Sequence, residues 1–305
     1  MVKPSLQVKL AGVKLENPLM NASGILGLTS YSLVRLAEAE LGALVTKSVG
    51  LEARPGSPNP TVVEVPVGLI NSMGLPNPGL EAFKAELKEA LAKIRKPLFV
   101  SVFGFNLREY GEAVRRLEGF PVAGFELNVS CPHVGGVGEI GGNPEALEEA
   151  VKEARASTEK PLLVKLSPNL SSFAEAARLV EKAGADGIVA TNTIRAMVID
   201  LEAGRPLLAG VYGGLSGPAL KPVALRCVYE AYEAVKIPIV GCGGIFTWRD
   251  ALEYFMAGAS AIQVGTALAY QGLEVFRSLL SGLSAYLEEK RIEDLSELVG
   301  VAHKR

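Results

Sequence analysis

The chain has 305 residues, of which 49% are hydrophobic and 21% charged, and its formal net charge is -2 at pH 7. This composition indicates a globular protein with a full core, and the charge argues against general binding to nucleic acid or anionic lipid. Three cysteines are too few for a disulfide framework, and no apolar run is long enough to cross a bilayer. We therefore expect a cytoplasmic protein without membrane contact and without a metal site built by this chain alone.

Short apolar runs alternate along the chain with longer amphipathic runs. The predicted strands are Pro18–Ala22, Ala43–Thr46, Leu98–Val102, Gly124–Val129, Leu162–Leu166, Gly187–Ala190, Ile237–Gly241 and Ala261–Val264. The predicted helices are Tyr31–Leu41, Gly79–Ile94, Leu107–Leu117, Pro144–Ser157, Ser172–Ala183, Pro218–Val235, Thr247–Ala257 and Val275–Glu288. Nearly continuous apolar strands are typical of a parallel sheet buried on both faces, so this alternation predicts an α/β fold, a (β/α)8 TIM barrel. The alternative is an open doubly wound sheet, which the lack of a Gly-x-Gly-x-x-Gly turn after the first strand disfavours.

Segments outside the repeating units complete the predicted barrel. Leu6–Val8 and Val13–Leu15 flank Ala11-Gly12, which predicts an N-terminal hairpin that closes the bottom of the barrel. Long connections follow the second, fourth and sixth strands, at Gly50–Asn77, Pro132–Asn143 and Thr193–Gly217. All three follow the C-terminal ends of strands, the face on which barrels carry their sites. No domain boundary stands out, so we expect residues 1–305 to form one domain.

Two lysines emerge from apolar strands, Lys47 from the second and Lys165 from the fifth. Burial of an unpaired ammonium is costly, so each lysine needs an anionic partner. The strand ends offer few acidic residues, and a bound anion is therefore the simplest explanation. The alternative for Lys165 is a structural lysine whose charged end reaches solvent.

Glycine pairs at the last two strand ends suggest where one anion binds. Gly243-Gly244 follows the seventh strand and Gly265-Thr266 the eighth, and each turn leads into a helix. Backbone N–H groups in such turns can bind a phosphate, although the glycines could also do no more than permit tight turns. A phosphate together with two lysines and several amides predicts flavin mononucleotide (FMN), with Lys165 stabilising the reduced ring.

Three asparagines on different strand ends or connections, Asn71, Asn128 and Asn192, present both donors and acceptors. Such amides suit a planar heterocycle rich in imide groups, although a lone asparagine is more often a turn former. Small residues in the segment 71–75 would allow its backbone N–H groups to meet a carboxylate. This combination predicts a substrate that carries both groups.

Cys131 follows the fourth strand directly and precedes the glycine-rich segment 134–142. A thiol at the C-terminal end of a barrel strand is placed to act as an acid or base. We expect Pro132–Asn143 to act as a lid that closes over the bound substrate.

Several long motifs occur in the order expected of one known family. They are Asn71-Ser-Met-Gly-Leu-Pro-Asn-Pro-Gly79, Leu127-Asn-Val-Ser-Cys-Pro132, Val164-Lys-Leu-Ser-Pro-Asn169, Gly213-Gly-Leu-Ser-Gly-Pro218 and Gly241-Cys-Gly-Gly244. Over most of its length the chain resembles the class 1 dihydroorotate dehydrogenases. The resemblance implies FMN-dependent oxidation of dihydroorotate to orotate in pyrimidine synthesis, with Cys131 as the base and Lys165 as a second catalytic residue.

Together, the residues and the resemblance assign two sets of binding positions. The expected FMN ligands are Ser23, Lys47, Ser48, Asn128, Lys165, Thr191, Gly217, Gly243, Gly244, Gly265 and Thr266. The expected substrate ligands are Lys47, Asn71, Ser72, Met73, Gly74, Leu75, Asn128, Asn192 and Thr193. Two positions depart from the family pattern, since His133 and Ser101 stand where the family usually has asparagine.

Further motifs separate the types within this family. Glu64-Val-Pro-Val-Gly68 and Gly142-Asn-Pro-Glu145 are more similar to the NAD-linked type B than to the fumarate-linked soluble type. Type B implies a second subunit with FAD and a [2Fe–2S] cluster, and we also expect a homodimer. The alternatives are the fumarate-linked type, another FMN barrel such as a dihydropyrimidine dehydrogenase or a dihydrouridine reductase, and a scaffold subunit without chemistry. The net charge argues against an RNA substrate.

Overall fold

A computed structural model of the chain describes residues 4–129 and 140–304. Its main sheet has eight strands, and every hydrogen-bonded pair of neighbours is parallel. The strands are β3 (Leu19–Asn21), β4 (Leu44–Val45), β7 (Leu98–Val102), β8 (Gly124–Asn128), β9 (Leu162–Leu166), β10 (Gly187–Ala190), β15 (Ile239–Cys242) and β16 (Ala259–Val264). From β4 to β16, each of these strands neighbours the next member of the set along the chain, and β16 neighbours β3. The predicted (β/α)8 barrel is therefore confirmed.

The seam between β3 and β4 is where an open sheet would have had its two edges. It is closed by a single parallel bridge between Met20 and Ala43 and by hydrogen bonds from the Asn21 side chain. Asn21 Oδ1 accepts from the Val45 N–H at 2.9 Å, and Asn21 Nδ2 donates to the Val45 carbonyl at 2.7 Å. The doubly wound alternative is therefore wrong.

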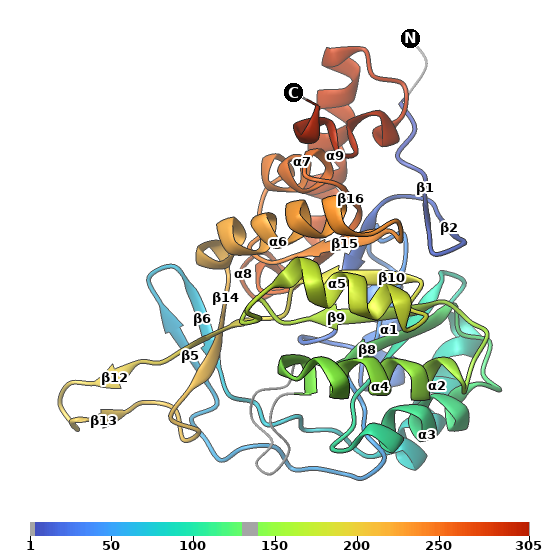
Figure 1. Cartoon of the computed structure of the whole chain (residues 1–305). Coiled ribbons are helices and arrows are strands. Elements are labelled where there is room, and N and C mark those ends of the chain that lie inside the picture. Colours follow the sequence, from blue (N-terminus) through green and yellow to red (C-terminus); the bar gives the residue numbers. More distant parts are fainter. Residues whose placement is uncertain (1–3, 130–139, 305) are drawn as a thin grey trace.

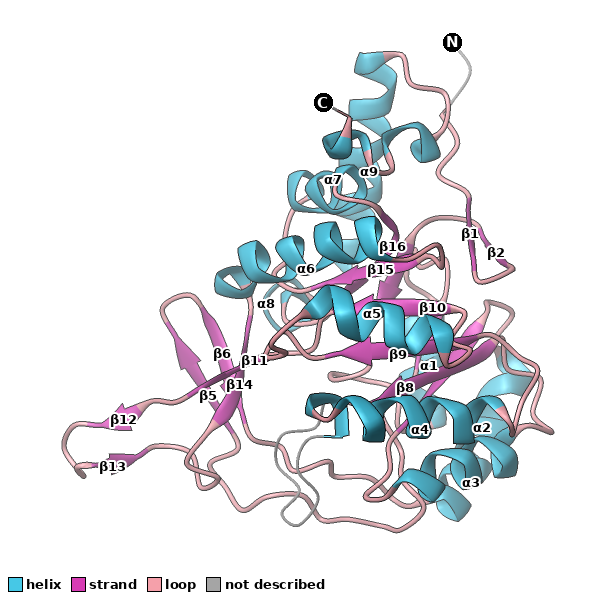
Figure 2. Ribbon diagram, viewed as in Figure 1, coloured by secondary structure: helices cyan, strands magenta, loops and turns pink. Residues whose placement is uncertain are grey.

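Helices follow the strands and cover the outside of the barrel (Figures 1 and 2). They are α1 (Ser30–Ala37), α2 (Leu80–Lys93), α3 (Leu107–Leu117), α4 (Pro144–Arg155), α5 (Phe173–Lys182), α6 (Lys221–Ala234), α7 (Trp248–Met256), α8 (Ala267–Gln271) and α9 (Glu274–Lys290). Side-chain caps begin several of them, as at Thr29 of α1 and Thr247 of α7. The short helix α8 was not predicted, and neither were the 3-10 turns Ile140–Gly142, Leu295–Leu298 and Val301–His303. The first residues of the predicted helix Pro218–Val235 form a 3-10 turn, Pro218–Leu220, before α6 begins.

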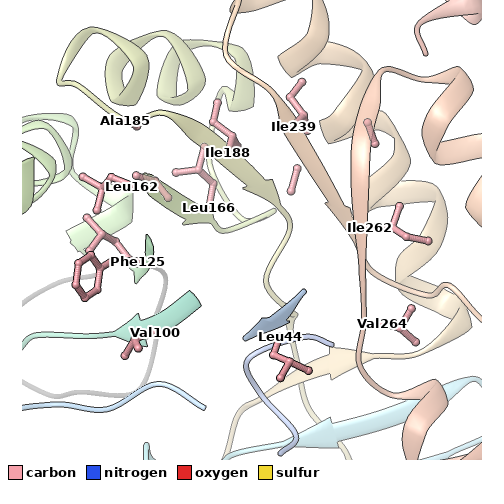
Figure 3. Packing of buried hydrophobic residues seen from close by; sticks show 14 of the residues in the cluster. Leu44, Val100, Phe125, Leu162, Leu166, Ala185, Ile188, Ile239, Ile262 and Val264 are labelled. Carbon is pink, nitrogen blue, oxygen red and sulfur yellow. The ribbon is translucent and has the colours of Figure 1, made fainter. Parts of the chain in front are cut away.

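The period of two in a strand divides the core into two clusters. Outward residues such as Phe125, Leu162 and Ile262 pack under the helices, as Figure 3 shows. Inward residues such as Phe99 and Leu163 fill the barrel interior. An antiparallel hairpin closes this interior, because Leu10 and Leu15 belong to the same inner cluster. The hairpin confirms the prediction, except that its first strand, β1, runs over Val8–Leu10 and not Leu6–Val8; the second strand, β2, is Val13–Leu15.

Two of the long connections meet in a second, smaller sheet. Its antiparallel strands are β5 (Val62–Val65), β6 (Gly68–Asn71), β11 (Ile194–Ala196) and β14 (Gly213–Ser216), in the order β11-β14-β6-β5. A hairpin of β12 (Ile199–Asp200) and β13 (Arg205–Pro206) extends beyond it. The sequence predicted these segments as connections only. In Figures 1 and 2 this sheet stands off the barrel beside the C-terminal ends of β9 and β15.

Segments near the two ends of the described chain pair with each other. The Ser5 N–H donates to the Glu293 carbonyl at 2.8 Å, and the Leu295 N–H donates to the Ser5 carbonyl at 3.1 Å. Figure 1 shows both ends of the described chain on the same side of the molecule, away from the small sheet.

Candidate functional site

A cavity of about 390 Å³ lies between the C-terminal ends of the barrel strands and the small sheet. This volume is in the usual range for a site that binds a small molecule or cofactor. Barrel strands contribute Lys165 and Gln263, and the small sheet contributes Leu69 and Ser216. The second and sixth connections therefore form a wall of the site.

Nearly all of the predicted binding residues that the structure describes line this one cavity. They are Ser23, Lys47, Ser48, Asn71, Met73, Gly74, Leu75, Asn128, Lys165, Thr191, Asn192, Thr193, Gly217, Gly243, Gly244, Gly265 and Thr266. Ser72 does not line it; its side chain is buried beside it, 1% exposed. Cys131, His133 and most of the predicted lid lie outside the described residues. The individual roles of all these residues stay predictions.

The end of the cavity formed by the last two barrel strands carries free backbone donors. Gly243 and Gly244 have φ values of 137° and 67°, a conformation that favours glycine. Among the residues that the structure describes, the N–H groups of Gly244, Ile245 and Thr266 have no hydrogen-bond acceptor. Backbone N–H groups without partners at the edge of a cavity can bind an anion such as a phosphate.

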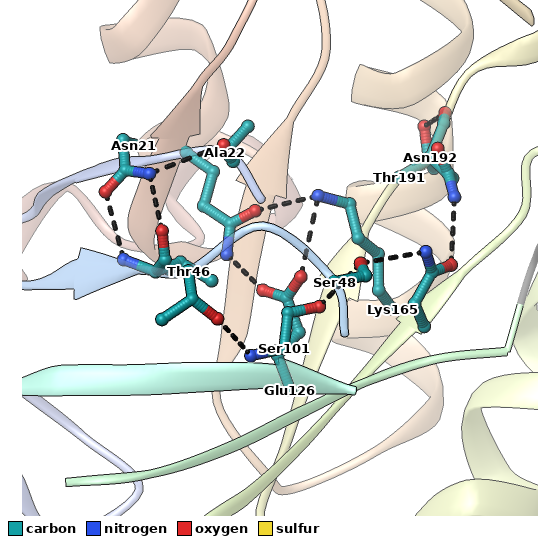
Figure 4. Close-up of polar contacts among 12 residues, drawn as sticks. Asn21, Ala22, Thr46, Ser48, Ser101, Glu126, Lys165, Thr191 and Asn192 are labelled. Atoms are coloured by element: carbon teal, nitrogen blue, oxygen red, sulfur yellow. Dashed lines mark hydrogen bonds and ion pairs between the residues drawn. The ribbon is translucent and has the colours of Figure 1, made fainter. Parts of the chain in front are cut away.

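Lys165 has a carboxylate partner within the barrel, which corrects the prediction that it requires a bound anion. Its Nζ lies 3.8 Å from Glu126 Oε1 and donates to Gln263 Oε1 at 2.9 Å. Gln263 Nε2 in turn donates to the other oxygen of Glu126, as Figure 4 shows. The amide thus has the polarity expected between an ammonium and a carboxylate.

The protonation of Lys165 follows from its neighbours. Burial lowers the pKa of its ammonium, but the Cys242 sulfur, once it is ionised at high pH, and the Glu126 carboxylate raise it by more, so the pKa lies above its ordinary value. Burial raises the pKa of the Cys242 thiol, which is therefore neutral at pH 7. Glu126 supplies the negative charge, and Lys165 lines the cavity as a cation.

Lys47 lies in a different environment. No hydrogen bond or ion pair joins its Nζ to any residue of the described chain, and burial lowers its pKa. A half-buried ammonium without a carboxylate partner still fits the prediction of a bound anion, now for this lysine alone.

A row of hydrogen-bonded hydroxyl and amide side chains runs along another wall of the cavity (Figure 4). Ser101 and Ser48 share a hydrogen bond between their hydroxyls at 2.9 Å, and Asn128 Nδ2 donates to Ser48 Oγ at 3.1 Å. Asn192 Nδ2 donates to Asn128 Oδ1 at 3.3 Å. Ser101 does not line the cavity, and it contacts the site through its hydrogen bond to the Ser48 hydroxyl.

The segment after β6 presents another set of backbone donors. Gly74 and Leu75 have φ values of 73° and 57°, and the N–H groups of Met73, Gly74 and Leu75 lack partners within the described residues. Backbone N–H groups without partners in a turn can bind an oxygen anion. That these donors bind the substrate carboxylate stays a prediction.

Sequence reasoning assigned no binding or catalytic role to Glu126, Gln263 or Cys242. All three occupy inward positions on barrel strands. Gln263 and Cys242 line the cavity, and Glu126 lies buried beneath it. A single polar residue within an apolar strand is the signal that could have identified Glu126, which is completely buried.

In the part of the chain that the structure describes, no helix is long and apolar enough to span a membrane. The same residues include no group of three or more histidine, cysteine, aspartate or glutamate side chains that could hold a metal ion.

Comparison with known proteins identifies relatives over the whole barrel. The family described as "Dihydroorotate dehydrogenase" matches residues 5–287. A Pyrococcus abyssi protein named "Dihydroorotate dehydrogenase B (NAD(+)), catalytic subunit" is 47% identical over 300 residues, which cover 98% of this chain and 99% of that protein. Proteins of the same name from Pyrococcus horikoshii and Geotalea uraniireducens are 46% and 45% identical, with coverage of at least 98% of both chains.

Proposed function

The chain belongs to the dihydroorotate dehydrogenase family, and on that premise we propose that it oxidises dihydroorotate to orotate in pyrimidine synthesis, with FMN as its cofactor. One observation carries this proposal most directly. The same cavity has free backbone N–H groups at one end and the Lys165 cation in its floor, with amide side chains on the wall opposite.

The residues present fit FMN. A Cβ added at Gly24 would meet no atom within 4 Å, and one at Gly265 would meet only Ala22 Cβ, so the backbone leaves open space there. The phosphate would be held by the N–H groups of Gly244, Ile245 and Thr266, and Lys165 would lie against the ring. When bound, FMN supplies the acceptor for the hydride that leaves C6 of dihydroorotate.

The chain's own residues account for substrate binding and proton transfer. We assign the carboxylate of dihydroorotate to the backbone N–H groups of residues 73–75 and to Lys47, whose ammonium has no carboxylate partner in the described chain. Asn71, Asn128 and Asn192 would bind its amide and imide edges. Cys131 would remove the proton from C5.

The relatives' names support a separate partner subunit and NAD as the final acceptor. We propose that this partner carries FAD and a [2Fe–2S] cluster, that the chain forms a homodimer, and that it acts in the cytoplasm. Fast turnover with fumarate by the chain alone would assign it to the fumarate-linked type.

The test of the proposed function is anaerobic mixing of the flavin-loaded chain with dihydroorotate, followed by the loss of flavin absorbance. Cys131→Ala should bind FMN and orotate but reduce its flavin about 10²–10⁴-fold more slowly, because general-base catalysis typically contributes that factor. The wild-type rate should rise with pH as the thiolate forms. Cys227→Ala, in α6 and away from the cavity, is the control. A near wild-type rate for Cys131→Ala would contradict its assignment as base.

A further inference from the structure

Tyr254 of α7 reaches from the outer layer of helices to the turn after β15. Its side chain is fully buried, and its hydroxyl donates to the Gly243 carbonyl oxygen at 2.5 Å. The pKa of Tyr254 is raised well above its ordinary value, first because of burial, so the hydroxyl stays protonated and remains a donor. The turn is therefore held from the side away from the cavity.

This bond determines the direction of the next peptide group. In a planar trans peptide the C=O and the following N–H point in opposite directions. Because the Gly243 carbonyl points toward α7, the Gly244 N–H points away from α7, and both glycines line the cavity. That N–H is one of the donors without an acceptor in the described chain.

The packing around the turn leaves room for this tyrosine only because of a glycine. A Cβ added at Gly241 would lie 2.4 Å from Tyr254 Cδ1. A second tether holds the far side of the turn, where Asp250 Oδ2 accepts from the Phe246 N–H at 3.1 Å and Asp250 Oδ1 accepts from Lys221 Nζ at 2.7 Å. Helix α7 thus holds the turn at two points, Gly243 through Tyr254 and Phe246 through Asp250.

We propose that Tyr254 is a positioning residue that holds the 243–245 turn in the conformation that binds a phosphate, and that it thereby sets the preference for FMN over riboflavin. The proposal rests on the proposed function, since it needs FMN in this cavity. Loss of the hydroxyl frees the Gly243 carbonyl, and the turn then spends less time with its N–H groups directed at the ligand. Cavity residues outside this turn, such as Lys165 and Asn128, would hold the rest of the flavin, and loss of the Tyr254 hydroxyl leaves them in place.

The test compares the dissociation constants of FMN and riboflavin for the flavin-free chain, measured by quenching of flavin fluorescence. Tyr254→Phe should weaken FMN binding roughly tenfold, the effect of losing one well-directed hydrogen bond to a charged group. Riboflavin binding should change less than about twofold, because it carries no phosphate. A general loss of stability would weaken the binding of both flavins alike and leave the ratio of their dissociation constants unchanged.

Tyr110→Phe is the matched control. Tyr110 of α3 is also buried and donates to a strand-end carbonyl, that of Asn128 at 3.1 Å, but on the side of the cavity away from the turn. It should leave the ratio of the two constants unchanged. If Tyr254→Phe does not fold, Asp250→Asn weakens the second tether and should shift the same ratio in the same direction.

The outcomes are distinct. If the wild-type chain binds FMN and Tyr254→Phe has the same ratio of FMN and riboflavin dissociation constants as wild type, this inference is wrong and the proposed function is unaffected. A wild-type chain that binds neither flavin overturns the proposed function, and the inference with it.

Discussion

At the scale of single residues, the pair of Glu126 and Lys165 decides the electrostatics of the cavity floor. Two charges inside a barrel are costly to desolvate, and their attraction compensates for this only with good geometry and added hydrogen bonds. Gln263 supplies those bonds to both partners. One buried carboxylate thus allows a cation to line the cavity.

Removal of this carboxylate should destabilise the fold and lower the pKa of Lys165. Glu126→Gln should cost about 3 kcal/mol of the free energy of unfolding at pH 7, measured by urea denaturation, because an uncompensated ammonium is left buried. The raised pKa of Lys165 means that the contribution of the pair is fully present below the ordinary value of 10.5 and is lost as the pH rises through the folded-state pKa. The difference between variant and wild type should therefore shrink as the pH rises through the lowered pKa of Lys165 in the variant and then through its raised pKa in the wild type.

The double variant Glu126→Gln with Lys165→Met provides the control. It should be more stable than the sum of the two single changes predicts, because the charge and its partner are removed together. Strict additivity would show that the two side chains do not interact.

At the scale of secondary structure elements, the barrel is weakest where β3 meets β4. Strand β4 has only two residues, and the Asn21 amide takes the place of backbone partners on both its N–H and its C=O side. A side-chain amide can do so because it carries the same donor and acceptor as a peptide group.

Asn21→Ala should therefore open this seam. It leaves two buried backbone groups of Val45 unpaired, at about 1–3 kcal/mol each, and should speed hydrogen exchange at the Val45 amide. Asn17→Ala, which removes a part-buried bond to the Leu19 N–H and a long, exposed bond to the Glu40 carbonyl, should cost less. Unchanged exchange at Val45 in Asn21→Ala would show that the seam does not depend on this amide.

At the scale of the whole molecule, two insertions distant in sequence form the wall of one cavity. Strands β6 and β14 pair, and Asn71 Nδ2 donates to the Gly214 carbonyl at 3.2 Å across 143 positions of sequence. The junction depends on Gly68, where an added Cβ would lie 1.9 Å from the Ser216 carbonyl oxygen.

Gly68→Ala should separate this sheet from the site and leave the barrel folded. We expect orotate affinity to fall at least about tenfold, since distortion of the pairing costs on the order of 1–3 kcal/mol. The circular dichroism spectrum should stay that of the wild type. Gly12→Ala, at a φ of 88° with no atom within 4 Å, introduces backbone strain in the N-terminal hairpin and should leave orotate affinity unchanged. Equal orotate affinity in Gly68→Ala and wild type would contradict a role for the sheet in the site.

The sequence predicted the barrel because its strands are continuous apolar runs, and it predicted which strand ends converge because parallel strands end on one face. It did not predict the small sheet. Strand β14 contains two adjacent glycines, β5 is partly exposed, and the partner of β6 lies far along the chain. Glu126 was missed for a related reason, since its partners come from β9 and β16 and only the register of the barrel brings them together.

The pairing of Ser5 with Glu293 and Leu295 makes the chain nearly circular. The strand order around the barrel also runs in sequence, with the last strand beside the first. The barrel could therefore be built from a chain that starts elsewhere in the ring. A circular permutant, joined by a linker between these two ends and opened at an exposed turn such as that between β12 and β13, would form the same ring of strand–helix units. The order of the elements along the gene is one of several that encode this architecture.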